Sequence, residues 1–407
     1  APAPDPEPPR VIREIAYEGN DITQPVTMKR ELVVKPGDLA EPGKVEESRQ
    51  AIQDLGLFRE VKVRQEPLDD GTVRLVFTVR EKWYVLPIPR LEINSDGDTA
   101  LGMQLRWNNL WGLDHRMDLD AIRHDYKRDD RDSSNNYALD YEIPFLGESR
   151  NALHFNVSHS DQNSNTDDGI DYRERKQSAS VGMARALTPG PASQGWKVGG
   201  GVAWQEQRTS GDGAPDDWGQ AIGPVASIRY RNQHDYIYSK TGAEFETSAG
   251  FSVDGMGSDY DSIFHESLYT QEWRVGRTDH QTLRLKGYLA GYYEGPASRE
   301  HDVYEFGGSE FLRGYKREKI DGNFAYLGAI DYLRPMHWKW LRFLATLEAG
   351  SALDQVDHAR GKYLYASFGL GVSVKVTWLV NVEFEAGFAY PLVDRDGDGV
   401  RFFGKSI

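Results

Sequence analysis

FGGSEFLRGYKREKIDGNFAYLGAIDYLRP, residues 306–335, has a polar, glycine-rich first half and a strictly alternating second half. One face of the second half carries Phe324, Tyr326, Gly328, Ile330 and Tyr332, and the other carries Ala325, Leu327, Ala329 and Asp331. An aromatic face backed by a face with an acid is typical of a strand between lipid and a polar interior. We therefore expect the preceding loop, with Arg313-Gly314-Tyr315, to fold back into a barrel and pair its arginine with an acid.

The composition of the 407-residue chain agrees with a β-barrel. Mean hydropathy is −0.62, and no window approaches the roughly 20 apolar residues of a membrane helix. A spanning barrel hides its apolar surface in alternate positions, and the 41 Gly, 21 Tyr, 16 Phe and 10 Trp favour one. The absence of cysteine excludes disulfides and suits an oxidising periplasm, and the net charge of −15 argues against nucleic acid as a partner.

The first 82 residues predict a tether and a small domain. Residues 1–9, APAPDPEPP, are predicted to be a disordered tether at the start of a processed chain. Residues 10–82 predict the order β-α-α-β-β, with strands at 11–17, 58–65 and 72–80 and helices at 25–32 and 43–54. Gly19, Gly37 and Gly56 occupy turns or helix ends that need a positive φ, and Phe58 begins the second strand.

Residues 83–407 predict a sixteen-stranded antiparallel transmembrane barrel, with about 20 residues for each strand and its connection. The predicted strands begin near Trp83, Thr99, Asp114, Asn136, Asn151, Tyr172, Gly195, Pro224, Gly242, Asp261, Thr282, Asn323, Leu341, Lys362, Leu379 and Val400. Short connections at 147–149 and 278–280 alternate with long acidic ones such as 209–223, as in outer-membrane proteins. The strand near Asp261 alternates poorly, so barrels of twelve or fourteen strands stay open.

The small domain closely resembles a POTRA domain, a periplasmic polypeptide-transport module. The matching stretches are Glu18-Gly19-Asn20, Lys35-Pro36-Gly37-Asp38 and Leu55-Gly56-Leu57-Phe58. The resemblance implies an unfolded or extended client polypeptide, which would bind by adding a strand to an exposed sheet edge.

The chain after residue 9 resembles the BamA/TamA/FhaC (bacterial surface antigen) superfamily, as a short member with one POTRA domain. The loop motif Arg313-Gly314-Tyr315 follows Gly307-Gly308, as the family pattern expects. Asp331 stands where the family commonly has Glu, and Glu348 stands where it has Asp. The resemblance implies that the loop at 295–322 folds into the lumen, and we expect Arg313 to pair with Asp331, Glu348 or both.

Two other constellations favour ordinary explanations. Asp394, Asp396 and Asp398 match the opening of a calcium loop, but strands flank them, so a hairpin turn with at most weak calcium binding is predicted. His154, Asn156 and Ser158 share one strand face and raise an outer-membrane lipid hydrolase as an alternative. Their spacing of about 6–7 Å is too long for direct hydrogen bonds, so polar lumen lining is favoured. We predict no catalytic residues and no cofactor.

Aromatic residues at strand ends predict the membrane boundary. Trp107, Trp111, Trp338, Trp340 and Trp378 are expected to anchor in the headgroup region. The last strand is short and contains Gly404 after Phe402 and Phe403, which suggests a weak seam with the first strand.

The resemblance implies a bacterial outer-membrane protein that captures polypeptide with its periplasmic POTRA domain and inserts or secretes it through the barrel. A scaffold for an envelope-spanning or lipid-homeostasis complex is the alternative. Expected partners are the client, outer-membrane lipid or lipopolysaccharide and a periplasmic protein, and a homodimer stays open.

Overall fold

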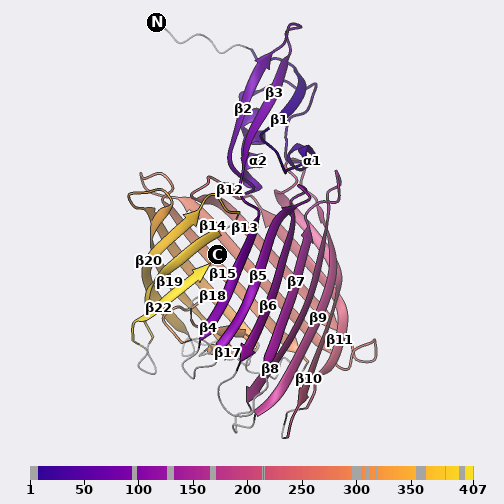
Figure 1. The fold of residues 1–407 in the computed structure, drawn as a ribbon, viewed down its shortest axis with the longest axis vertical. Coiled ribbons are helices and arrows are strands. Elements are labelled where there is room, and N and C mark those ends of the chain that lie inside the picture. Colours follow the sequence, from indigo (N-terminus) through magenta and orange to yellow (C-terminus); the bar gives the residue numbers. More distant parts are fainter. Residues whose placement is uncertain are drawn as a thin grey trace.

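The computed structural model describes residues 8–93, 99–125, 133–165, 171–212, 214, 216–295, 304–308, 311–316, 320–353, 364–380, 382–393 and 399–406. A small domain stands on one end of a large barrel, and the chain enters the barrel directly from it (Figure 1). The predicted tether at 1–9 lies outside the described residues up to residue 7.

The small domain contains three strands and two helices in the predicted order. They are β1 (Ile12–Glu18), α1 (Pro25–Lys29), α2 (Pro42–Asp54), β2 (Phe58–Pro67) and β3 (Val73–Glu81). The sheet order is β1-β3-β2, with β1 parallel to β3, and its core includes Met28, Ile52 and Phe77. The first helix is shorter than predicted, because the N–H groups of Glu31 and Leu32 donate to the carbonyl oxygens of Met28 and Lys29, three residues back, and so form a tighter turn. Among the described residues, no helix has the length and apolar character needed to cross a membrane.

Sixteen long strands form the barrel. They are β4 (Val85–Ile93), β5 (Thr99–Leu110), β6 (His115–Asp125), β7 (Ser134–Ile143), β8 (Asn151–Asn165), β9 (Asp171–Ala186), β10 (Gly195–Ser210), β11 (Gly219–Arg231), β13 (Lys240–Ser252), β14 (Ser262–Arg274), β15 (Thr282–Glu294), β18 (Phe324–Pro335), β19 (Leu341–Leu353), β20 (Tyr365–Val376), β21 (Val382–Pro391) and β22 (Arg401–Ser406). Neighbours from β4 to β22 pair antiparallel, and β22 lies beside β4 to close the ring. The predicted barrel is confirmed.

Three short strands lie outside this set. The two-residue β12 (His234–Asp235) pairs with the start of β13. The strands β16 (Tyr304–Phe306) and β17 (Ile320–Gly322) pair with each other in the long connection between β15 and β18.

The predicted long loop at 209–223 is wrong in extent. Strand β10 continues to Ser210 and β11 already begins at Gly219, because Gln207 pairs with Gly219 and the ladder runs on from there. Glycines at 219 and 223 of β11 have no side chain to mark a face, so the sequence pattern hid this part of the strand.

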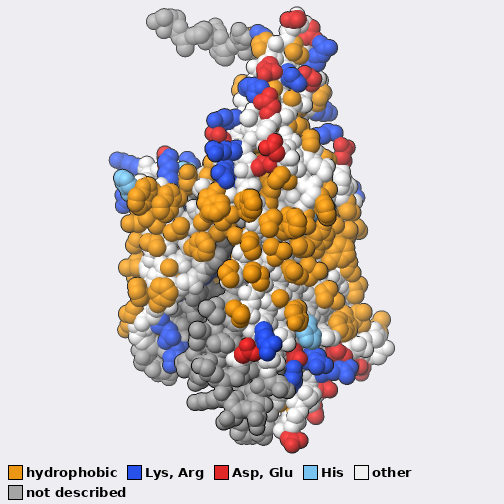
Figure 2. Space-filling model, in the orientation of Figure 1, with side chains coloured by type: hydrophobic (Ala, Val, Ile, Leu, Met, Phe, Trp, Pro, Cys, Tyr) orange, Lys and Arg blue, Asp and Glu red, His pale blue; other side chains and the backbone are white. Residues whose placement is uncertain are grey.

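The outer surface of the barrel is an apolar band. Figure 2 shows hydrophobic side chains over the middle of the visible face and charged groups at both ends. On β18 and β19, Ile330 and Leu347 point outward and are exposed, whereas Asp331 and Glu348 point inward and are buried. This pattern is that of a barrel with lipid outside and polar groups inside.

We expect Gly19→Ala to destabilise the small domain by about 1–3 kcal/mol. Gly19 has a φ of +78°, and an added Cβ would lie 2.2 Å from the carbonyl oxygen of Val79 in the neighbouring strand. The matched control is Gly43→Ala in α2, where no atom lies within 4 Å of the added Cβ. Urea-dependent proteolysis of the small domain in the full chain measures both. Equal resistance of the two variants would contradict this assignment.

Candidate functional site

The long connection between β15 and β18 packs against the inner wall of the barrel. Among its described residues, Phe306, Leu312, Tyr315 and Ile320 are buried and share a core with inward residues of β18 and β19. Phe306 and Phe311 lie 6.2 and 5.9 Å from the ring of Tyr288 on β15. The aromatic contacts fix this loop on the barrel wall.

Arg313 lies at the centre of this loop and is only 1% exposed. Its backbone N–H donates to Glu348 Oε2 at 2.8 Å, and its Nε lies 3.5 Å from Glu348 Oε1. Its Nη2 donates to Glu385 Oε2 at 3.2 Å. The guanidinium carbon also lies 5.0 Å from the ring centroid of Phe403, a cation–π distance. One side chain therefore connects the loop to β19, β21 and β22.

The residues that follow Arg313 fit closely against the wall. An added Cβ on Gly314 would lie 2.8 Å from Pro391 N and 2.9 Å from Ser367 Cβ, so only glycine allows this approach. The Tyr315 hydroxyl accepts from Ala366 N–H at 3.2 Å and lies within donating distance of the Ala366 and Val393 carbonyl oxygens.

Of the two acids expected for Arg313, Glu348 lies against it, whereas Asp331 makes its direct contacts with other groups. Its carboxylate lies 3.0 Å from Lys286 Nζ and 3.6 Å from Arg284 Nη1, and it accepts from the Thr346 hydroxyl at 2.7 Å. Arg284 stands directly opposite Asp331 in the ladder between β15 and β18, so the cross-strand neighbour takes the acid.

The sequence reasoning missed the network that joins these pairs. Arg284 lies between Glu385 Oε1 at 3.3 Å and Glu272 Oε1 at 3.4 Å. Arg342 donates to Glu383 Oε1 at 2.6 Å. The signal was present in the sequence, because these charges alternate with apolar residues along β15, β19 and β21 and must therefore point inward.

The residues proposed for the seam divide between the two faces of β22. Phe402 is 67% exposed on the outside, whereas Phe403 is fully buried in the lumen beneath Arg313. Adjacent strand residues point to opposite faces, so the two cannot act together as one surface. Gly404 pairs with Ala386 of β21.

A second cluster fixes the small domain on the barrel mouth, with Asp54 at its centre. The Asp54 carboxylate accepts from Asp235 N–H at 2.8 Å and lies 2.8 Å from His234 Nδ1 in the turn between β11 and β13. The hydrogen bond to Asp54 raises the pKa of His234. This contact joins the end of α2 to the barrel.

A buried acid makes a second connection at the mouth. Glu31 accepts from both the N–H and the hydroxyl of Ser193, at 3.1 and 2.7 Å, in the turn between β9 and β10. Burial raises the pKa of Glu31. The Thr27 hydroxyl donates to the Gly112 carbonyl oxygen at 2.8 Å in the turn between β5 and β6.

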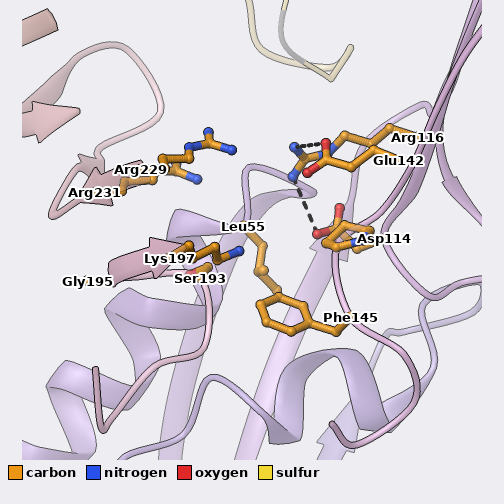
Figure 3. Close-up of a pocket in the computed structure, with 11 residues that line it drawn as sticks. Leu55, Asp114, Arg116, Glu142, Phe145, Ser193, Gly195, Lys197, Arg229 and Arg231 are labelled. Carbon is orange, nitrogen blue, oxygen red and sulfur yellow. Dashed lines mark hydrogen bonds and ion pairs between the residues drawn. The ribbon is translucent and has the colours of Figure 1, made fainter. Parts of the chain in front are cut away.

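A small polar cavity of about 20 Å³ lies just inside this mouth, and it has room for about one water molecule. Figure 3 shows Lys197, Arg229 and Arg231 facing the Arg116–Glu142 ion pair across it. Phe145 lies at its edge, with Lys197 Nζ 4.5 Å and the Arg30 guanidinium 4.4 Å from the ring centroid. The mouth is therefore a charged and closely packed contact.

Comparison with known proteins agrees with this architecture. Residues 10–82 match the POTRA family model, described as a surface antigen variable number repeat. Residues 109–404, well over half of the chain, match the Omp85 superfamily domain. The chain belongs to the Omp85 superfamily. It is an outer-membrane protein whose POTRA domain lies in the periplasm, so the mouth described above is the periplasmic end of the barrel.

Individual relatives of this Omp85 protein include an assembly factor and two solved structures with the same fold. It is 30% identical over 110 residues to the outer membrane protein assembly factor BamA of Neorickettsia risticii (strain Illinois), and the match spans 26% of this chain and 14% of that relative. The fold matches CdiB from Escherichia coli with a TM-score of 0.63 at 17% identity, covering 98% of this chain and 76% of CdiB. BamA from Haemophilus ducreyi lacking POTRA domains 1–3 matches with a TM-score of 0.55 at 15% identity, covering 98% and 85% of the two chains.

The remaining candidate residues of this Omp85 chain have separate environments. The exposed tryptophans Trp107, Trp111, Trp338, Trp340 and Trp378 lie at the periplasmic ends of their strands or in the adjoining turns. His154 Nε2 lies 2.7 Å from Asp140, whereas the Ser158 hydroxyl bonds to Ser178 at 2.7 Å, so His154 and Ser158 have different partners. Asp394, Asp396 and Asp398 lie outside the described residues, and the described part of the chain contains no cluster of metal-ligating side chains.

Gly19, Gly37 and Gly56 have φ values of +78°, +96° and +74°. Phe58 is fully buried in the POTRA core. All four residues therefore support the fold of the POTRA domain.

We expect Arg313→Met to destabilise the Omp85 barrel by about 3–5 kcal/mol, because Glu348 and Glu385 would remain buried without their partner. The matched control is Arg123→Met, which removes an exposed ion pair with Asp125 and should cost at most about 1 kcal/mol. Urea titration of folded and unfolded bands on semi-native gels measures both variants. A similar loss of unfolding free energy in the two variants would show that the buried contacts of Arg313 do not stabilise the barrel.

Docking of the POTRA domain should weaken as the pH rises. The pKa of His234 is raised in the docked state, so the protonated form is favoured there. Its contribution is fully present below the ordinary histidine pKa and is lost as the pH passes the raised value. Glu47 and Arg231 are the other charged groups that act on this ring. Protease access to the mouth between pH 5 and 9 should rise in the parent chain and rise less in His234→Gln, in which buried Glu31 still titrates.

Proposed function

We propose that this Omp85 protein receives an extended client polypeptide in the periplasm and inserts it into the outer membrane at the seam between β22 and β4. The family relationship supports assembly or secretion in general, and the observation that favours the seam is the short last strand. Strand β22 has six residues, whereas the other fifteen barrel strands have nine to sixteen. A short strand offers fewer ladder hydrogen bonds to hold the ring closed.

Next to the β22–β4 seam, the ring is also closed by a contact outside the named strands. Trp83, just before β4, forms a parallel bridge with Leu379, just before β21. Its N–H donates to the Trp378 carbonyl oxygen at 2.9 Å, and its own carbonyl oxygen accepts from Val380 N–H at 3.3 Å. The residue just before β4 thus pairs with the segment just before β21. Opening the seam at the periplasmic side requires that these two bonds break.

The POTRA sheet offers one edge for client capture. Strand β1 is flanked at its start by residues 37–40, with Ile12 N–H donating to Asp38 O at 2.8 Å and Ala40 N–H to Arg10 O at 2.8 Å. Strand β2 is the other edge of the sheet, and β3 is its ladder partner among the described residues. An extended polypeptide would add to β2 through main-chain hydrogen bonds, with little demand on client sequence.

The lumen offers less room for passage on the side of the C-terminal strands. The loop around Arg313 and the ion network around Arg284 lie against β15 and β18 to β22 there. Transport through this half would require the loop to leave its buried contacts, whereas lateral insertion would not. This difference favours insertion over secretion.

A two-part cross-linking experiment tests the proposal. A photoreactive residue at Lys62 on β2 should capture clients in cells, and one at Glu46 on α2 should capture far fewer. Recovery of nascent barrel proteins supports insertion. Recovery of one large exoprotein would indicate secretion, and recovery of an envelope-spanning partner would indicate a scaffold.

The second part locks the seam in the naturally cysteine-free chain. A short bifunctional thiol reagent on Trp83→Cys/Leu379→Cys should abolish client assembly until it is cleaved. The control pair Ile330→Cys/Leu347→Cys joins neighbouring residues of β18 and β19 away from the seam and should leave assembly unchanged. Full activity of the locked seam variant would contradict insertion at this seam.

A further inference from the structure

The strand with poor alternation, β14, carries two polar side chains, His265 and Ser267, on the lipid-facing surface, although Glu266 and Glu272 of the same strand point inward. Glu246 of β13 points into the lumen, where its Oε2 lies 4.0 Å from Arg229 Nε, so Thr247 next to it points outward. Ser267 of β14 is the ladder partner of Thr247 and therefore also points outward. One part of the irregular pattern in the sequence is therefore a polar stripe, His265 and Ser267, on the outside.

Three of these outward side chains form one hydrogen-bonded cluster. The Ser267 hydroxyl donates to Thr247 Oγ1 at 2.7 Å and lies 2.8 Å from His265 Nε2. Thr247 Oγ1 lies 3.3 Å from the same ring nitrogen. Among the described residues, Nδ1 of His265 has no hydrogen-bond partner. The cluster thus presents a free ring nitrogen to whatever covers the barrel wall.

The depth of the cluster places it within the apolar band. Trp273, which is 43% exposed, lies at the periplasmic end of the same outward face, and Ile263, which is 44% exposed, lies near the other end. Ser267 is about 20 Å along the strand from Trp273, at about 3.3 Å per residue. Acyl chains offer no donor or acceptor, so lipid leaves the free polar groups unsatisfied at this depth.

A second copy of this chain meets the requirements of the site. All copies insert in the same orientation, so a polar group at a given depth on one copy meets the same group at the same depth on another. A hydroxyl group both donates and accepts, so Ser267 or Thr247 of one copy can turn to donate to the free His265 nitrogen of the other, and a two-fold axis repeats this bond in reverse. Ala249 and Gly287 on the same outer face are small, which lets two barrel walls approach closely.

A contact between copies at the Thr247, His265 and Ser267 cluster would leave the β22–β4 seam uncovered. Counted in ring order, the boundary between β13 and β14 lies seven long strands from the β22–β4 seam in one direction and nine in the other. A contact at this boundary therefore leaves the seams of both copies facing away from each other.

We propose that Thr247, His265 and Ser267 form the centre of a symmetric interface between two copies of this chain within the outer membrane. The proposal does not depend on the nature of the client. It assigns the polar stripe of β14 to self-association.

Ala249→Cys tests the contact without altering the cluster. Ala249 is exposed on the outer face and is the ladder partner of His265. Copper-phenanthroline oxidation of native outer membranes should give a reducible band at twice the 46.0 kDa chain mass. Leu370→Cys, an exposed outward residue of β20 near the seam, is the matched control. We expect at least tenfold more dimer from Ala249→Cys.

A second variant separates the interface from the fold. In the Ala249→Cys background, Thr247→Val/His265→Leu/Ser267→Ala should lose at least nine-tenths of the dimer band and remain heat-modifiable like the folded parent. Mass photometry of the purified parent and triple variant in nanodiscs should give dimer and monomer, respectively. The proposal is overturned by dimer yields equal to the Leu370→Cys control, by an undiminished dimer in the triple variant, or by cross-linking to a different protein in place of a second copy.

Discussion

An arginine that is almost completely buried inside a barrel sets the main constraint on this structure. A guanidinium cannot give up its proton in a protein, so its charge must be met by carboxylates and hydrogen-bond acceptors where it lies. Glu348 and Glu385 meet it from β19 and β21, and Phe403 covers it from β22. The contacts of the Arg313 guanidinium therefore connect the loop, the inner wall and the last strand.

The same constraint makes the two halves of the lumen different. On the side of β15 and β18 to β22, four cations and five acids of the described residues share contacts in a nearly dry environment, and removal of one leaves another without its partner. On the side of β7 and β8, the His154–Asp140 pair is nearly half exposed, so its charges are solvated. Glu31 and Asp54 of the POTRA domain bind to the turn between β9 and β10 and the turn between β11 and β13, which belong to this more open half. The molecule thus combines a filled half that carries the seam with an open half beneath the periplasmic domain.

Sequence alternation predicted the side on which a residue lies far better than it predicted the residue's partner. The order of the small domain, the sixteen strands and the inward direction of Asp331 and Glu348 all follow from periodicity and turn residues. Glu348 was among the acids expected beside Arg313, but Glu385 was not, because parity gives no depth along the barrel axis. Asp331 belongs to Arg284 through strand register, whereas Glu385 reaches Arg313 from a strand distant in sequence. Glycines concealed the start of β11 for a related reason, since a residue without a side chain marks neither face.

The failure of alternation in β14 has a physical meaning of its own. Its inward face carries Phe264 and Leu268, and Phe264 packs 5.8 Å from the ring of Tyr292. Tyr292 in turn lies 6.1 Å from Tyr304, so the inward apolar residues extend the aromatic contacts that hold the lumen loop. The loop therefore accounts for apolar groups inside the barrel, but it gives no reason for His265 and Ser267 outside. The inner face of β14 therefore contacts the lumen loop of the same chain, and the outer face carries the cluster proposed as the interface with a second copy.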